Sequence, residues 1–595
     1  MCKTKKDVLV LFKTHLDIGY TDSAKNVTDK YLNTFIPNAI KVGNELLNTE
    51  TPFVWTTGSW LIWQALKNDT DGSVEQAIKD GIIRWHALPC TTHTELMSKK
   101  LFEYGVSISQ KLDKRFGKKT IAAKMTDVPG HTMGIVPVLA DADIEFLHLG
   151  VNTATPLPPV PPVFKWRCDD KEITVIYQSS YGKPMEFDDF VIYFAHTYDN
   201  AGPQSSAEII EIYDKIKAEY PDCTVRAATL DDVAVKLREL KDIPVIDKEI
   251  GDTWIHGVGT DPKKVGMYRE LLRVVDSIPK EELDKIDLTD NLLLVPEHTW
   301  GMCLNKYFHD TTTWYNEELK KTEGSEQRQL FESSWSEQRE YVTSAARTLN
   351  HSFEYSTEQP KLENYDKVWD IKTDDLSEAL SSEIEFELSW QLFDRDDYTR
   401  YMHEYLTFDA ENVGWAIWDY LKLGMPDYKG GIYTAFCTQC YKNKQNNKML
   451  YKLEFEEAAA ANYGLPCFWA EVSGGRVSIL MTGKEASRLP QAFWFKLKGL
   501  TEDWQLSKLD RWIKPEDIVG SPLISAADGG VKNTDTAVYP LDSVLVAPYG
   551  RNLLRYNIKN PKQDMYFNLY NNIWNTNFPM WYSDDTLFRF DIKKI

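Results

Sequence analysis

The chain has 595 residues, 43% of them hydrophobic and 26% charged, which is typical of a folded protein with several domains. Its net charge of −21 repels phosphate backbones and anionic membranes, so we expect neither nucleic acid nor a membrane as a partner. No stretch predicts a signal peptide or a membrane span, and we therefore expect a cytoplasmic protein.

The first 300 residues predict β/α units around a parallel sheet. Short runs rich in β-branched and aromatic residues alternate with helical patterns such as 31–48, 207–219 and 230–240. Strands are expected at 8–13, 53–57, 82–87, 120–125, 146–149, 174–178, 191–195, 225–228 and 292–295. Ligands of parallel α/β folds lie at the carboxyl ends of the strands, and polar residues follow most of these runs.

The sequence pattern changes after residue 300. Residues 310–349 predict a helix, and 377–392 and 396–408 supply further helical pieces, so a helical bundle is expected. From about residue 410 the apolar runs shorten and Gly-rich turns multiply, which indicates an antiparallel β domain. We therefore expect domains at 1–300, 301–408 and 409–595.

Four side chains at predicted strand ends form a candidate metal site. His15 and Asp17 follow the first strand, and residues two apart in an extended chain point to the same side. Asp127 ends another strand, and His298 follows the last one. Two imidazoles and two carboxylates suit Zn²⁺, although another divalent ion fits the same set.

These segments resemble glycoside hydrolase family 38, the retaining α-mannosidases. The resemblance lies in K-T-H-L-D-I-G-Y-T at 13–21 and in T-D-V-P-G-H-T at 126–132. It implies an α/β (β/α)7-type barrel carrying the site, then a three-helix bundle and an antiparallel β-sandwich. It also implies that His15, Asp17, Asp127 and His298 bind zinc and that Asp127 is the nucleophile.

The resemblance makes Asp199, in H-T-Y-D-N at 196–200, the best match for the general acid/base. A retaining glycosidase needs such a second carboxyl group about 5 Å from the nucleophile. Asp199 could instead cap the helix that begins near residue 205, and Asp189, in an acidic pair with Asp188, is the second choice for the acid. The chain departs from the family at D-I-G-Y, 17–20, and at E-H-T, 297–299, which places it in a divergent branch.

Further polar and aromatic residues near strand ends are candidates for substrate binding. Core packing or a buried polar network is the alternative for each of them. They are Trp60, His93, Glu95, His131, Trp254, His256 and Trp300.

The sequence therefore predicts a metal-dependent retaining α-glycosidase, most like an α-mannosidase, that acts on a carbohydrate. A metal-dependent carbohydrate deacetylase and a non-catalytic carbohydrate-binding protein are the alternatives. The sugar, the linkage, exo or endo action and the metal stay open. The oligomeric state stays open too, and a homo-oligomer is compatible with the sequence.

Overall fold

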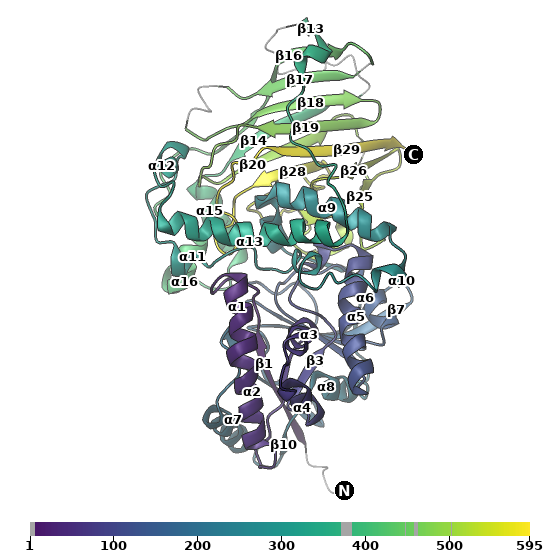
Figure 1. The fold of residues 1–595 in the computed structure, drawn as a ribbon, viewed down its shortest axis with the longest axis vertical. Helices are drawn as coiled ribbons and strands as arrows, with labels where there is room; N and C mark the ends of the chain where they lie inside the picture. Colours follow the sequence, from purple (N-terminus) through teal and green to yellow (C-terminus); the bar gives the residue numbers. More distant parts are fainter. Residues whose placement is uncertain (1–5, 370–383, 447, 457–461, 501) are drawn as a thin grey trace. The chain divides into compact units, whose positions relative to one another are not determined.

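The computed structural model describes residues 6–369, 384–446, 448–456, 462–500 and 502–595. The chain forms two compact units (Figure 1). Unit 1 comprises Met1–Thr94, Lys99–Lys248 and Pro296–Thr299, and unit 2 comprises Glu95–Ser98, Glu249–Val295 and Trp300–Ile595. The chain thus returns to unit 1 for the four residues that contain His298.

Unit 1 is a mixed α/β domain built on two sheets. In the first sheet the order is β3 (Ile83–His86), β2 (Trp55–Gly58), β1 (Asp7–His15), β9 (Phe190–Asp199) and β8 (Met185–Glu186), with β10 (Thr224–Ala227) also pairing with β1. In the second it is β11 (Val245–Ile246), β6 (Val163–Cys168), β7 (Lys171–Ser179), β5 (Phe146–Val151) and β4 (Ala122–Asp127). All pairs are parallel except β8 with β9 and β6 with β7.

The two sheets of unit 1 share a core. Leu9, Leu11 and Ile192 of the first sheet belong to the same buried cluster as Phe146 and Ile176 of the second. A backbone hydrogen bond of 3.0 Å from Ala87 N–H to the Ala122 carbonyl joins the end of β3 to β4. The expected parallel α/β architecture is confirmed, while closure into a seven-fold barrel stays a prediction because the strand ladders form two sheets.

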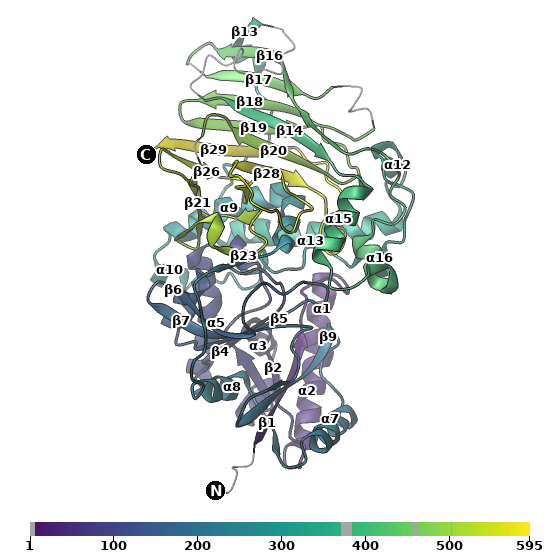
Figure 2. The ribbon, with the colours of Figure 1, turned by 180° about the vertical axis from the view of Figure 1, so that it is seen from behind.

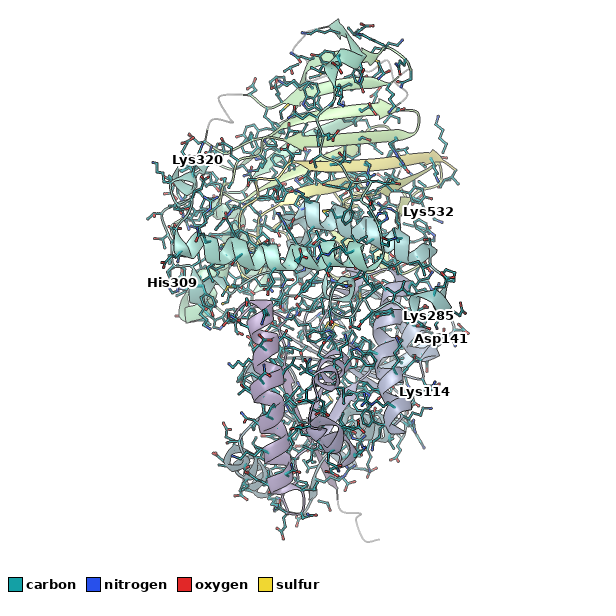
Figure 3. All side chains as sticks on the ribbon, viewed as in Figure 1. Lys114, Asp141, Lys285, His309, Lys320 and Lys532 are labelled. Atoms are coloured by element: carbon teal, nitrogen blue, oxygen red, sulfur yellow. The ribbon has the colours of Figure 1, made fainter. Side chains whose placement is uncertain are left out.

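Helices connect the strands of unit 1 (Figures 1 and 2). They are α1 (Ala24–Lys30), η1 (Tyr31–Phe35), α2 (Ile36–Leu46), α3 (Ser59–Lys67), α4 (Ser73–Lys79), α5 (Lys99–Phe116), α6 (Ile135–Asp141), α7 (Ser206–Glu219) and α8 (Leu230–Leu237). Capping boxes at Ser205 and Thr229 satisfy the first N–H groups of α7 and α8. The charged side chains of Lys114 and Asp141 point away from the ribbon (Figure 3).

One expected strand of the first 300 residues is wrong. Residues 292–295 contain a short 3₁₀ helix, Leu292–Leu294, whose first N–H is capped by the Asn291 side chain. The three leucines are buried, so the apolar run marked a core segment but not its backbone conformation. Strand β6 was not expected, because its Lys165 and Arg167 interrupt the apolar pattern.

Unit 2 contains helices and two antiparallel sheets. Its longer helices are α9 (Pro262–Ser277), α13 (Glu326–Thr348) and α15 (Arg395–Tyr405), and its shorter ones are η3 (Thr253–Thr260), α10 (Lys280–Leu283), α11 (Leu304–Tyr307), α12 (Asn316–Lys320) and α16 (Gly414–Tyr420). The helix expected over 310–349 is thus present as α12 and α13. The bundle and the boundaries at residues 300 and 408 stay predictions.

The expected antiparallel β domain is confirmed. One sheet has the order β13 (Tyr365–Trp369), β16 (Phe436–Asn443), β17 (Met449–Glu454), β18 (Cys467–Ser473), β19 (Arg476–Thr482), β29 (Thr586–Lys594), β26 (Thr536–Pro540), β25 (Gly530–Lys532), β21 (Gln505–Lys508) and β22 (Arg511–Ile513). The other has the order β15 (Gly431–Thr434), β14 (Phe386–Leu392), β20 (Gln491–Leu497), β28 (Tyr566–Asn571), β27 (Leu545–Ala547) and β24 (Ser525–Ala526). Phe590 contacts Phe495 and Phe567 of the second sheet at ring-centroid distances of 4.3 and 5.2 Å, so the sheets pack face to face. β12 (Glu249–Gly251) pairs with β23 (Ile518–Gly520).

The helix expected over 377–392 is wrong where the structure describes it. Residues 386–392 form the interior strand β14, in which Phe386, Leu388 and Trp390 are buried. The preceding part, 377–383, lies outside the described residues. The helix expected over 396–408 is confirmed by α15. In the described part of the chain, no helix has both the length and the apolar character needed to cross a bilayer.

Candidate metal centre

Four potential metal ligands of unit 1 converge as the sequence predicted. One ligand atom from each of His15, Asp17, Asp127 and His298 lies within 4.8 Å of the others, and all four residues are buried. His298 Nε2 lies 3.0 Å from Asp17 Oδ1 and 3.4 Å from Asp127 Oδ2, while His15 Nε2 lies 3.2 Å from Asp17 Oδ1. The two imidazoles and two carboxylates therefore surround one point.

The second nitrogen of each imidazole is held by a neighbouring polar group. His15 Nδ1 lies 2.8 Å from the Thr126 hydroxyl oxygen. His298 Nδ1 donates to the Glu297 carboxylate at 2.6 Å. Such contacts fix ring orientation and keep Nε2 directed at a metal.

A short pairing of two loops delivers His298. The Pro296 carbonyl accepts hydrogen bonds of 2.8 Å from the Thr92 hydroxyl and from the His93 N–H. His298 N–H donates to the Thr91 carbonyl at 3.3 Å. The fourth ligand thus arrives on a bridged loop and not at the end of a strand.

Asn200, directly after β9, holds the loop that carries Asp17. Its side-chain oxygen accepts from Asp17 N–H at 3.0 Å, and its amide group donates to the carbonyls of Asp17 and Gly19 at 3.1 and 3.2 Å. These contacts join the segment after β9 to the loop after β1. Asp17 is therefore placed by β9 as well as by β1.

The backbone is strained around the site. Asp127 has φ 79°, and Ser180 and Tyr181 have φ 59° and 60°, which non-glycine residues rarely adopt. Gly150 on β5 makes room for this turn, since a Cβ there would lie 2.6 Å from the Tyr181 carbonyl carbon. The strained turn brings the Tyr181 side chain to the site.

The Tyr181 hydroxyl bridges two carboxyl groups. It lies 3.0 Å from Asp127 Oδ1 and 2.8 Å from Asp199 Oδ1. Asn152 donates to the same Asp127 oxygen at 2.8 Å. A hydroxyl carries a single proton, so it can donate to both carboxyl groups only in turn, unless one of them is protonated and donates to it.

The charges around these carboxyl groups push their pKa values apart. Burial, together with the charge of Asp17, raises the pKa of Asp199 to about 6. Burial alone would also raise the pKa of Asp127, but the hydrogen bond to His298 and the charges of His15 and His298 hold it below its usual range. Two carboxyl groups with separated pKa values are the arrangement that acid/base catalysis uses.

The donor set fits a metal ion. Asp17 Oδ2 is buried without a hydrogen-bond partner in the described part of the chain, although a carboxylate oxygen in that position needs one. A cation among these ligands would satisfy it. Two nitrogen and two oxygen donors are a common set for Zn²⁺, and the identity of the ion stays a prediction.

The other candidates of unit 1 have different surroundings. Asp188 and Asp189 are exposed and precede β9, at the end opposite Asp199, so only Asp199 reaches the site. His131 is buried, with Nε2 3.0 Å from the Val128 carbonyl oxygen, and holds the turn after Asp127. His93 is buried beside the Pro296 carbonyl, and Trp60 is buried at the start of α3.

The remaining candidates lie in unit 2. The Glu95 carboxylate accepts from Lys508 at 2.6 Å and from Ala526 N–H at 3.2 Å. Trp300 is buried under the Lys264 ammonium, which lies 3.6 Å from its ring centroid. His256 is buried, and Trp254 is half-buried in η3. Substrate binding by these residues stays a prediction.

Sequence reasoning did not assign roles to several residues of the site. Tyr181 and Asn152 stand on loops without a motif, and only the structure brings them to Asp127. Thr126, Asn200 and Glu297 each directly adjoin a predicted site residue. Adjacency to a predicted site residue was the signal that could have identified these three.

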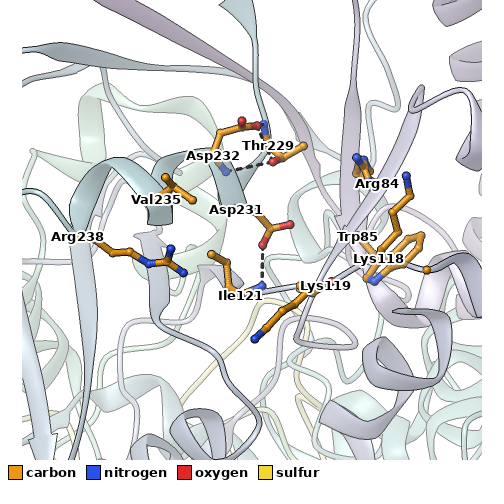
Figure 4. Close-up of a pocket in the computed structure, with 12 residues that line it drawn as sticks. Arg84, Trp85, Lys118, Lys119, Ile121, Thr229, Asp231, Asp232, Val235 and Arg238 are labelled. Atoms are coloured by element: carbon orange, nitrogen blue, oxygen red, sulfur yellow. Dashed lines mark hydrogen bonds between the residues drawn. The ribbon is translucent and has the colours of Figure 1, made fainter. Parts of the chain in front are cut away.

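A hollow of unit 1, of about 550 Å³, lies between the start of β4 and the N-terminus of α8 (Figure 4). It is open to solvent beside the N-terminus of α8, where Asp231 accepts from Ile121 N–H at 2.8 Å. Arg84, Lys118 and Arg238 line it. None of the predicted site residues lies there.

Comparisons with known proteins agree with this architecture. A family model described as "Domain of unknown function (DUF5054)" matches residues 258–373. A search of curated proteins by sequence finds no match.

Two solved structures from Enterococcus faecalis resemble the whole chain. An α-mannosidase of strain V583 superposes with a TM-score of 0.54 at 9% identity, covering 99% of this chain and 87% of that one. A protein of glycosyl hydrolase family 38 gives a TM-score of 0.51 at 8% identity, covering 100% and 86%. The resemblance stated from the sequence is thus confirmed at the level of the fold: the chain folds like glycoside hydrolase family 38 proteins.

Proposed function

We propose that the chain is a metal-dependent retaining α-glycosidase in which Asp127 is the nucleophile and Asp199 the general acid/base. The observation that carries the proposal is the Tyr181 hydroxyl, which contacts both carboxyl groups. The Tyr181 hydroxyl lies 3.0 Å from one Asp127 oxygen and 2.8 Å from one Asp199 oxygen, which limits the distance between these two oxygens. This limit agrees with the separation of roughly 5 Å between the two carboxyl groups of retaining glycosidases.

Each carboxyl group has the protonation state that its role requires. With a pKa near 6, Asp199 can hold a proton for the leaving oxygen at mildly acidic pH. Asp127 is held ionised, and its carboxylate can attack the anomeric carbon to form a glycosyl-enzyme. Asp199 then takes a proton from the water that hydrolyses this ester.

The neighbouring groups hold the nucleophile in place. Asn152 and Tyr181 both donate to Asp127 Oδ1, which leaves Oδ2 on the side of the two histidines. A divalent ion held by His15, Asp17, Asp127 and His298 would supply positive charge for binding sugar hydroxyls.

An α-mannoside is the first substrate to test. The sequence motifs resemble those of α-mannosidases, and one similar structure is an α-mannosidase. A cytoplasmic location is part of the same proposal.

The test is hydrolysis of a panel of nitrophenyl α- and β-glycosides with and without EDTA. We expect activity on an α-glycoside, loss with EDTA and recovery with one divalent metal. The matched variants are Asp127→Asn, expected to lose at least about 10³-fold in kcat/KM, and Asp188→Asn, an exposed carboxylate expected to leave activity unchanged.

Trapping identifies the nucleophile. A 2-deoxy-2-fluoro glycoside should leave a sugar ester on Asp127 that mass spectrometry of peptides locates. Acetate release from an acetylated sugar, without cleavage of any glycoside, would instead support the deacetylase. Binding of sugars without turnover in the metal-loaded protein would support a non-catalytic protein.

A further inference from the structure

A layer of basic side chains lies inside unit 1, on strands β1, β3, β4, β5 and β9. We call Lys13, His86, Lys124, His148 and His196 the basic layer. Lys13 is the register neighbour of His196, and Lys124 that of His148. Register neighbours in a parallel sheet point to the same face, so each sheet contributes one ammonium and at least one imidazole.

The layer is buried where α/β domains normally place apolar residues. Lys13 is 2% exposed and Lys124 is 6% exposed, and His86 and His148 are buried as well. Lysine is almost never buried to this extent unless it is paired. Burial of two lysines in one interior therefore needs a compensating group.

Protein groups satisfy these ammonium groups only in part. Lys13 donates to the Tyr181 carbonyl, and Lys124 donates to the Thr14 carbonyl at 3.1 Å and to the Thr126 hydroxyl at 3.4 Å. An ammonium has three donors. In the described ranges, no carboxylate forms a salt bridge with either lysine, and Nδ1 of the buried His86 has no partner.

The five basic groups lie within electrostatic range of one another. Burial, and then the charges of Lys13 and Lys124, lower the pKa of His148 well below its usual value. The same causes lower the pKa of His86, and they contribute to that of His196, which falls to about 3. The lysines thus act on all three imidazoles, while burial without a counter-charge lowers the pKa of Lys124 itself to about 7 and lowers that of Lys13 as well.

The layer is packed around one aromatic ring. His148 stacks on Phe194 at 4.3 Å, and the Lys13 ammonium lies 5.5 Å from the same ring centroid. Phe194 belongs to β9 and His148 to β5, so both sheets close around this point.

We propose that the basic layer binds one small inorganic anion of halide size, held by Lys124 together with Lys13 and His148. A halide accepts N–H donors from any direction, as donors from several strands require. It supplies the negative charge that the protein does not place beside the lysines. None of these three residues is a proposed metal ligand, although Lys124 donates to the Thr126 hydroxyl that lies 2.8 Å from His15 Nδ1. The anion site does not depend on the proposed glycosidase activity.

The test uses the full chain without substrate. The melting temperature is measured in sodium bromide, sodium chloride and sodium gluconate at equal ionic strength. We expect a saturable rise of about 1–3 °C with either halide relative to gluconate. In crystals grown with bromide, an anomalous peak should lie within about 3.5 Å of Lys124 Nζ.

Two variants separate the anion site from a general salt effect. Lys124→Met should abolish the halide-dependent rise, whereas Lys118→Met, a lysine outside the interior, should retain it. If Lys124→Met fails to fold, the anomalous signal in bromide crystals of the unaltered protein still tests whether an anion binds beside Lys124. Equal melting curves in bromide and gluconate, with only water refined near Lys124, would overturn the proposal.

Discussion

At the scale of single residues, Tyr181 is the group that connects the two proposed catalytic carboxyls. Its hydroxyl is 3.0 Å from Asp127 and 2.8 Å from Asp199, and its ring stacks on His15 at 4.9 Å. Tyr181→Phe keeps the ring and removes the bridge. We expect kcat/KM to fall about 10- to 100-fold with little change in the melting temperature.

The control for Tyr181 is Tyr198→Phe, which removes an exposed hydroxyl two residues from His196. It should leave kcat/KM within about twofold of the unaltered enzyme. If Tyr181→Phe kept full activity with an unshifted pH profile, the bridge would have no part in catalysis.

Asp199 gives the enzyme a defined pH dependence. Burial and the charge of Asp17 raise its pKa to about 6, and the acid form is needed to protonate the leaving oxygen. Above pH 6 that form is lost, so kcat/KM should fall tenfold per pH unit on the alkaline side. The profile is measured with a poor leaving group, for which protonation limits the rate.

Substitution of Asp199 is a second test of its assignment as the general acid. Asp199→Asn should lose about 10²- to 10⁴-fold on a disaccharide and far less on a dinitrophenyl glycoside, which needs no acid. Its alkaline limb should also disappear. An unchanged limb in the variant would mean that another group supplies the proton.

The residue scale is also where the sequence was most informative. His15, Asp17, Asp127 and His298 were predicted because four potential ligands follow predicted strands in segments that resemble family 38 motifs, and the structure brings all four together. Tyr181 could not be predicted in this way. Its position depends on a left-handed turn and on contacts with residues distant in sequence, which no local pattern encodes.

At the scale of elements, the close approach of β5 to the Tyr181 turn depends on Gly150. A methyl group there would lie 2.6 to 2.9 Å from backbone atoms of Tyr181, and backbone cannot move aside cheaply. We expect Gly150→Ala to lower kcat/KM at least tenfold by displacing Tyr181, and to lower the melting temperature. Gly414→Ala is the control, since nothing lies within 4 Å of a Cβ at that position.

Helices and strands were predicted correctly where the segment's own sequence pattern determines its conformation. The predictions failed where pairing with other strands determines it. Strands β1 and β5 are buried on both faces and are apolar over most of their length, a pattern that sequence carries directly. Residues 386–392 were expected to be helical, yet pairing with β15 and β20 makes them a strand. Leu292–Leu294 shows the reverse case, an apolar run that forms a short 3₁₀ helix and not the expected strand.

At the scale of the whole molecule, the metal site joins segments that are far apart in the chain. The chain leaves unit 1 at Lys248 and returns for Pro296–Thr299, so its fourth ligand follows a separate stretch of 249–295. The sequence predicted the ligand but not this division, because the expected domain boundary at residue 300 placed the whole stretch in one barrel.

Metal binding should therefore stabilise the folded chain against unfolding. A ligand that binds only the native state adds about 4 kcal/mol at a thousand times its Kd, and the ligands are brought together only by folding. We expect the melting temperature of metal-free protein to rise on titration with Zn²⁺. His298→Ala should lose most of this rise, because it removes the ligand that holds 296–299 at the site, whereas His403→Ala, an exposed histidine of α15, should keep it. Equal stabilisation of both variants by zinc would place the metal elsewhere and remove the basis for the proposed chemistry.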